Sequence, residues 1–390
     1  MKEHLLLFPF ALFLIILPFP HTIVIRMLTL TLLFLIALRI WWIQRPYNEP
    51  LPGKRVIGLW VAVCLLSLTY AIDPVYSLKE MKGELLNTLG AFFAFFVIAG
   101  NMERAKYLLR AIATGLIIIG GWAAIAWIFN DFSWDETGGY GGIGIFSTYL
   151  ATILPTMIWL SMCDSNRNWR RIAIALLPFV FLLAYATKQR AVWPALGAEI
   201  FICWFLLVRL GKLPKPRFSW LGVFIISAAI TIGITNQIHE ERTQGSSQMA
   251  SDDRISFWPD VVKNITEHPM SGGGFGRNAM KKAYPELIPE YNSWLWHSHN
   301  LFLNYGISMG LPGIVAIILL FGFWGRFFWR AATQDQSLAG MAGLAVVAGV
   351  VIRNQTNDFF VRDMSLLFWA QVGILARIYI HDIRARRVTA

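Results

Sequence analysis

Residues 296–323 read WHSHNLFLNYGISMGLPGIVAIILLFGF, a short polar segment followed at once by a long apolar run. The apolar run, 301–323, reaches the length of about 20 residues that a helix needs to cross a bilayer. The polar segment places His297 and His299 where such a helix would leave the membrane. Imidazole titrates near neutral pH, so it can accept a proton there. We therefore expect a membrane helix with a chemical site at its end.

The rest of the chain repeats this apolar pattern. It is 56% hydrophobic and only 15% charged over 390 residues, and a soluble protein could not bury that much apolar surface. The runs close to spanning length are 5–19, 23–43, 56–72, 85–99, 108–129, 143–162, 172–186, 191–208, 220–235, 301–323, 338–352 and 365–380. The sequence predicts an all-α polytopic membrane protein with about 12 transmembrane helices.

The charges between these runs predict their orientation. Lysine and arginine gather in alternate connections, for example around Arg171 and Arg209, and basic connections stay in the cytoplasm. The net charge of +11 follows from this pattern, so we expect membrane lipids and no nucleic acid as partners. Both termini are predicted to be cytoplasmic. Residues 1–235 would hold nine helices, 236–300 a periplasmic loop, and 301–390 three helices and a cytoplasmic tail.

The long loop carries signals for short helices. Residues 251–253, Ser-Asp-Asp, are typical of a helix N-cap, and apolar residues follow at helical spacing. His268-Pro269 should end this amphipathic helix, and a second short helix is predicted over 279–284. The apolar residues of the first helix are Trp258, Val261, Val262 and Ile265.

Cations in the short external connections oppose the orientation bias. For any one of them, a side chain that reaches toward lipid phosphate is a sufficient explanation. Together they indicate a polyanion site, because arginine holds diphosphate oxygens through bidentate, charge-assisted hydrogen bonds. The charged residues of this set include Lys188, Arg190, Arg254, Arg353 and Asp363. Arg26, inside the second run, has no explanation at this level.

His299 could be a metal ligand, a structural hydrogen-bond donor or a general base. His297 and Asp363 could add ligands, but no metal motif surrounds them. The external arginines and the adjacent Asn300 favour the general base. We therefore predict a site without metal or cofactor.

Several short motifs resemble those of the O-antigen ligase and polymerase superfamily. They are Arg254-x-x-x-Trp258, His268-Pro269, the glycine run 272–276, His297-x-His299-Asn300, Gly310-x-x-Gly313 and the basic segment 187–193. The resemblance implies a membrane glycosyltransferase of the GT-C type in the bacterial inner membrane, with its active site on the periplasmic face. Such an enzyme takes a sugar chain from undecaprenyl diphosphate. In the ligase branch it transfers this O-antigen to a hydroxyl of the lipid A–core oligosaccharide.

The resemblance also implies roles for individual residues. Arg190 and Arg254 match the arginines expected to bind the diphosphate, and His299 matches the histidine expected to activate the acceptor hydroxyl. His297 is expected to orient its neighbour or to contact sugar. The reaction would invert the anomeric centre without a metal. Further substrate contacts are predicted for Lys188, Asn300, Arg353 and Asp363.

Two alternatives stay open. An O-antigen polymerase of the same superfamily would share the scaffold and the sugar donor. A transporter of polysaccharide or lipid also has about a dozen helices, although its ionisable residues usually lie near the bilayer midplane.

Overall fold

The computed structural model describes residues 2–44, 50–213, 253–290, 295–358, 360 and 362–389. All regular elements in these ranges are helices. Eight of them are long and apolar enough to cross a membrane, and Leu5–Ile16 and Leu338–Arg353 are shorter apolar helices. The protein is therefore an all-α polytopic membrane protein, as its composition predicts.

Each predicted run except 220–235 overlaps a helix; 220–235 and the loop residues 236–252 lie outside the described residues. The helices of the bundle are α1 (Lys2–Ile16), α2 (Ile23–Ile43), α3 (Lys54–Leu66), α4 (Pro74–Met81), α5 (Asn87–Ile98), α6 (Met102–Phe129), α7 (Ile143–Cys163), α8 (Arg167–Ala186), α9 (Val192–Arg209), α13 (Leu301–Thr333), α14 (Leu338–Arg353) and α15 (Arg362–Thr389). The third helix is shorter than predicted, because α3 ends at Leu66 and only the short 3-10 turn η1 (Ser67–Thr69) follows.

The fourth predicted span is longer than expected. It was predicted to begin at residue 85, but α4 begins at Pro74 and continues through the π-helical turn η2 (Lys82–Leu86) into α5. Asp73 caps α4 by accepting a hydrogen bond from a first-turn backbone N–H at 2.9 Å, and proline suits the first helical position. A search for apolar runs missed this segment because it is charged. It places Glu80 and Glu84 on one continuous helix.

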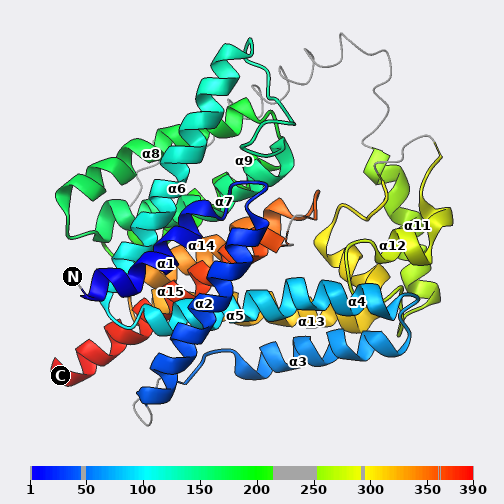
Figure 1. Ribbon diagram of the computed structural model, residues 1–390, viewed down its shortest axis with the longest axis horizontal. Helices are drawn as coiled ribbons and strands as arrows, with labels where there is room; N and C mark the ends of the chain where they lie inside the picture. Colours follow the sequence, from blue (N-terminus) through cyan, green and yellow to red (C-terminus); the bar gives the residue numbers. More distant parts are fainter. Residues whose placement is uncertain are drawn as a thin grey trace.

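The last helix, α15, lies inside the bundle and packs against α5, α14 and α6 (Figure 1). Its Trp369 stacks on Trp60 at a centroid distance of 6.1 Å and meets Phe92 edge to face at 5.6 Å. Gly373 lets α5 approach closely, since a Cβ there would lie 2.7 Å from the Phe92 carbonyl oxygen. This packing fixes the position of the N-terminal turn of α15.

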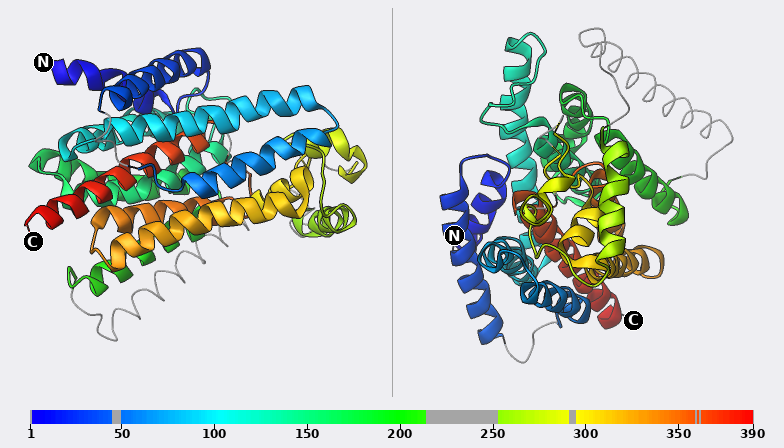
Figure 2. Two further views of the ribbon diagram at one scale, coloured as in Figure 1. Left: turned by 90° about the horizontal axis from the view of Figure 1, so that it is seen from below. Right: turned by 90° about the vertical axis from the view of Figure 1, so that its right-hand side faces the viewer.

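The two ends of the bundle differ. The loop helices α11 (Asp253–Glu267) and α12 (Ala279–Ala283) lie at one end, and both chain termini lie toward the other (Figure 2). At the first end, the backbone N–H of Leu301 donates to the carbonyl of Asn354 at 2.9 Å. We call this end the site end. It includes the first turns of α13 and α15 and the last turn of α14.

The helices predicted in the long loop are confirmed. Helix α11 ends at Glu267, directly before His268-Pro269, and α12 matches the second prediction. Val261 and Ile265 are buried against α12 and α13. Val262, the next residue after Val261, is 45% exposed.

Candidate functional site

Helix α13 is kinked beneath the site. Gly310 has a φ of +68°, outside the helical region, and Pro312 follows it. The turn after α11 docks into this kink: the N–H of Leu311 donates to the carbonyl of Pro269 at 2.7 Å. A Cβ at Gly310 would lie 2.5 Å from that same carbonyl oxygen, so only glycine fits. The kink thus joins two of the motifs that lie far apart in the sequence.

The glycine run uses the carbonyls that the kink leaves without helical partners. The N–H of Gly273 donates to the carbonyl of Ile307 at 3.0 Å. At Gly272, a Cβ would lie 2.6 Å from the Ile307 oxygen, so the backbones touch. This docking fixes the chain directly before Arg277.

Helix α11 forms hydrogen bonds to two segments of the site end. One is the histidine segment before α13, and the other is the connection between α14 and α15. The indole Nε1 of Trp258 donates to the carbonyl of Ser298 at 2.8 Å. One turn earlier, Nη1 of Arg254 donates to the carbonyl of Thr356 at 2.7 Å. Residues four apart share a helix face, so the Arg-x-x-x-Trp spacing lets one helix bind both segments.

Asn300 caps α13. Its Oδ1 accepts hydrogen bonds from the N–H groups of Phe302 and Leu303 at 2.9 and 3.1 Å. Its Nδ2 donates to the carbonyl of Gln355 at 2.9 Å. The amide therefore has a structural role, and its contact with substrate stays a prediction.

The histidine pair is stacked and ordered. The imidazole centroids of His297 and His299 lie 3.8 Å apart at an interplanar angle of 29°. Nδ1 of His297 accepts a hydrogen bond from the backbone N–H of His299 at 3.1 Å. His299 has a φ of +51°, a conformation that is uncommon outside glycine, and His297 holds it there. Nδ1 of His299 lies 3.4 Å from Oδ1 of Asn357.

Arg277 is a central residue that the sequence analysis missed. Its Nη2 lies 2.9 Å from Nε2 of His297, and its guanidinium lies over Trp296 at 5.1 Å from the ring centroid. Its Nε lies 3.9 Å from Oδ2 of Asp358, which is 1% exposed. The available signal was its position directly after the glycine run.

This arrangement keeps His297 neutral. Burial, followed by the positive charge of Arg277, lowers the pKa of His297 far below its usual value. Its two ring nitrogens face a guanidinium and a backbone N–H, both of which are hydrogen-bond donors. A protonated ring would place N–H donors against both of them, whereas a neutral ring places only one. The partly exposed His299 is therefore the better candidate for a general base.

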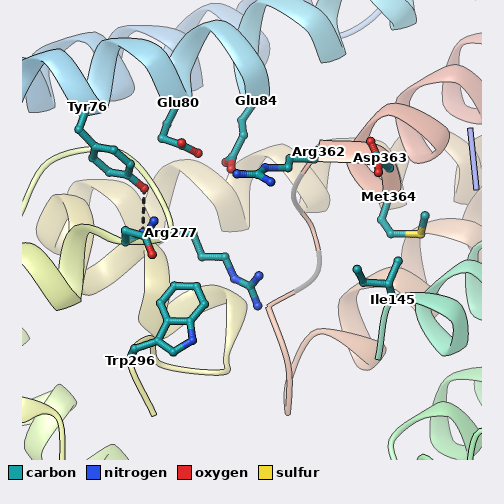
Figure 3. A pocket seen from close by; sticks show the side chains of 10 residues that line it. Tyr76, Glu80, Glu84, Ile145, Arg277, Trp296, Arg362, Asp363 and Met364 are labelled. Carbon is teal, nitrogen blue, oxygen red and sulfur yellow. Dashed lines mark hydrogen bonds between the residues drawn. The ribbon is translucent and has the colours of Figure 1, made fainter. Parts of the chain in front are cut away.

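A pocket of about 320 Å³ opens beside Arg277 and Trp296 (Figure 3). Glu80 and Glu84 reach into it from α4 and η2, and Arg362 reaches in from α15. Other lining residues are Tyr76, Asn278 and Asp363. The apolar runs do not predict Glu80 and Glu84 as site residues, because the charged segment that carries them shows no apolar run.

Asp363, a predicted substrate contact, lines the pocket and forms an ion pair with Arg26. Arg26 is 3% exposed, and its Nη1 also donates to the carbonyl of Leu17 at 3.1 Å. The pair explains the arginine within the second apolar run. It also neutralises the charge of Asp363.

The remaining predicted residues are Arg353, Lys188 and Arg190. Arg353 is fully buried, and its Nη2 donates to Oγ of Ser147 at 2.7 Å, which ties α14 to α7. Lys188 is half-exposed and Arg190 exposed in the turn between α8 and α9, and neither lines the pocket. Their contacts with substrate stay predictions.

Comparison with known proteins agrees with the motifs. The sequence model of the O-antigen ligase family matches residues 172–318, from α8 to the middle of α13. The chain is 22% identical over 353 residues to an O-antigen ligase of Pseudomonas aeruginosa, an alignment that covers 86% of this chain and 80% of that protein. The matched segment contains Arg190, Arg254, Arg277 and both histidines. Together, the two matches support the assignment of this chain to the O-antigen ligase superfamily.

Proposed function

We propose that the protein is an O-antigen ligase of the GT-C type. It transfers O-antigen polysaccharide from undecaprenyl diphosphate to a hydroxyl of the lipid A–core oligosaccharide, on the periplasmic face of the inner membrane. The observation that carries this proposal is the position of His299 beside Asn357, whose neighbour Thr356 is bound by Arg254. A candidate base and a candidate diphosphate ligand thus meet at one short connection between α14 and α15.

In the proposed reaction, His299 takes the proton of the acceptor hydroxyl. The acceptor oxygen attacks the anomeric carbon from the face opposite the diphosphate, and the bond between that carbon and the diphosphate oxygen breaks. The configuration inverts, and polyprenyl diphosphate leaves with the electron pair. Arg254 and Arg190 neutralise the charge that develops on the leaving group. A positioned base contributes about 10²–10⁴ in rate.

His297 has a supporting part in this scheme. It is neutral, buried and hydrogen-bonded to the backbone of His299, so it orients the base instead of sharing its chemistry. The proposed function also includes weaker substrate contacts by four further residues, Lys188, Asn300, Arg353 and Asp363.

The test is transfer by the purified protein in detergent, with undecaprenyl-diphosphate-linked O-antigen and lipid A–core supplied together. A ligase converts the lipid A–core band on a gel into a ladder of capped molecules. A polymerase lengthens the polyprenyl-linked chains and leaves the lipid A–core unchanged. A transporter forms no product, because detergent solution has no second compartment. Either of the last two outcomes would refute the ligase assignment.

Deletion in cells gives a second, independent readout. Loss of a ligase leaves lipopolysaccharide uncapped while long polyprenyl-linked polymer accumulates. Loss of a polymerase instead leaves single repeat units attached to the core. The similarity to a protein described as an O-antigen ligase favours the first result.

A further inference from the structure

The histidine pair lies between two parts of the site end. Arg277 contacts His297, His297 stacks on His299, and His299 lies beside Asn357. Beyond Asn357, Arg254 binds the carbonyl of the preceding residue. The pocket of about 320 Å³ is lined by Arg277 and not by Arg254.

We infer that this pocket binds the terminal sugar ring of the acceptor glycan. The inference rests on the proposed function, because a transferase whose base is His299 needs its acceptor hydroxyl next to the histidines. Since Arg254 is the proposed ligand of the diphosphate and does not line the pocket, the sugar donor would occupy a different part of the site end. The pocket is then left for the acceptor.

The charges that line the pocket fit an uncharged polyhydroxylated ligand. Glu80 and Glu84 can accept hydrogen bonds from sugar hydroxyls, and Arg277 and Arg362 can donate to hydroxyl and ring oxygens (Figure 3). Asp363 does not upset this balance, because Arg26 neutralises it. A diphosphate would meet the two glutamates at close range, and like charges repel strongly in a partly buried site.

The aromatic side chains and the size of the pocket point the same way. Tyr76 is held in place by a hydrogen bond from the N–H of Asn278 to its hydroxyl at 2.9 Å. Trp296 offers an apolar ring beside Arg277. Aromatic residues with a polar tip suit a ligand that has both apolar and polar faces. A volume of about 320 Å³ lies at the small end of ligand pockets, enough for the end of a glycan.

The helix that supplies both glutamates has a local irregularity. Glu84 lies in the π-helical turn η2. Such turns are rare in proteins overall, but those that occur are often at functional sites. Glu80 precedes Glu84 by one turn, so both carboxylates face the same side. Lys79 and Lys82, on the exposed side of the same segment, do not line the pocket. They provide matched control positions.

The test compares Glu80→Gln, Glu84→Gln and the double variant with Lys79→Gln and Lys82→Gln in the purified transfer assay. One series varies lipid A–core at saturating sugar donor, and the other varies the sugar donor at saturating lipid A–core. We expect the double glutamate variant to raise the KM for lipid A–core by about ten-fold or more, since hydrogen bonds to charged groups are lost. The KM for the sugar donor should stay at its wild-type value in the glutamate variants. In both lysine variants, the KM values for both substrates should stay at wild-type values.

A binding measurement covers the case of a variant that does not fold. Ile145 is 44% exposed and lines the pocket, so Ile145→Cys places a thiol in it without altering the charged residues. Lipid A–core, purified from a strain lacking this protein, should slow maleimide labelling of Ile145→Cys. Undecaprenyl-diphosphate-linked O-antigen should not.

The outcomes separate the two proposals. A wild-type protein that makes no transfer product refutes the proposed function. An active wild type whose glutamate variants leave the KM for lipid A–core unchanged, or raise the KM for the sugar donor instead, overturns the assignment of the pocket. Protection of Ile145→Cys by the sugar donor alone would overturn it as well.

Discussion

Arg277→Met should destabilise the protein through Asp358, and the size of the effect depends on pH. Asp358 is 1% exposed, and its Oδ2 lies 3.9 Å from Nε of Arg277. Removing one partner of a buried ion pair costs about 3–5 kcal/mol when the other charge stays buried. Asp358 can avoid part of that cost by binding a proton. Burial already raises its pKa to about 6, although Arg277 opposes the shift, so Arg277→Met should raise it further.

Protonation of Asp358 limits the loss of stability in Arg277→Met. At pH 7.5, protonating a carboxyl of pKa about 6 costs at most about 2 kcal/mol. With the lost contact to His297 added, we expect Arg277→Met to lower the free energy of unfolding by about 2–3 kcal/mol. With an unfolding entropy of about 2.1 cal/mol/K per residue over 390 residues, that corresponds to a fall of about 2–4 °C in the apparent melting temperature. At pH 5.5 the deficit should shrink, because Asp358 is then already largely protonated.

The assay is thermal unfolding of detergent-solubilised protein at one fixed scan rate, followed by tryptophan fluorescence. Asp358→Asn and the double variant complete a double-mutant cycle. The double variant should regain most of the stability lost in Arg277→Met, since neither charge is then left alone. A melting temperature of Arg277→Met that equals wild type at pH 7.5, or a double variant less stable than Arg277→Met, would refute the coupling.

Further outcomes are expected. His299→Ala should bind both substrates nearly normally but transfer on the order of 10²-fold more slowly, in steady-state assays with both substrates saturating; near-normal turnover would remove it as the base. Arg254→Ala should weaken binding of the polyprenyl diphosphate as well as transfer, and Arg254→Lys should restore only part of either, because an ammonium lacks the bidentate fork. Met270→Cys, on the exposed turn after α11, should react with an impermeant thiol reagent in spheroplasts, whereas Lys212→Cys should not; the opposite pattern would reverse the proposed orientation. The folded-state pKa of Asp358, about 6, lies above its ordinary value of 3.8, so its contribution to stability is present at low pH and is lost as the pH rises through 6. Asp358→Asn should therefore flatten the pH dependence of the melting temperature between pH 5 and pH 7, and an unchanged slope would contradict the shift.

The sequence predicted the membrane helices because their signal is local. Apolar runs identify spans without any knowledge of neighbours, and the helical spacing in α11 needed only one turn of context. Predicting the segment from Pro74 to Glu84 would have needed information beyond apolar runs, since Lys79, Glu80 and Lys82 interrupt the apolar pattern. Asp73-Pro74 carried a usable cap signal, which an apolar search does not weigh.

Candidate site residues were predicted only where motifs marked them. His297, His299 and Arg254 were predicted because they belong to such motifs, and the structure brings them to adjoining segments, while their roles stay predictions. Glu84 was missed because nothing in its local sequence distinguishes it from a surface charge, and Arg277 was missed because its only signal was its position directly after the glycine run. Their positions depend on a glycine run docking onto a kinked helix, and on a helix whose existence was itself not predicted.

The ion pair between Arg26 and Asp363 has a consequence for how the chain enters the membrane. Arg26 is synthesised more than 300 residues before Asp363, so translation separates the two charges by roughly 20–70 s. During that interval α2 carries a cation without its final partner. Arg26 lies in the first turn of α2, close enough to the helix end for its side chain to reach lipid headgroups while it waits. When α15 is inserted, Asp363 pairs with Arg26 and the arginine becomes buried. The last helix to be synthesised thus fixes the position of one of the first.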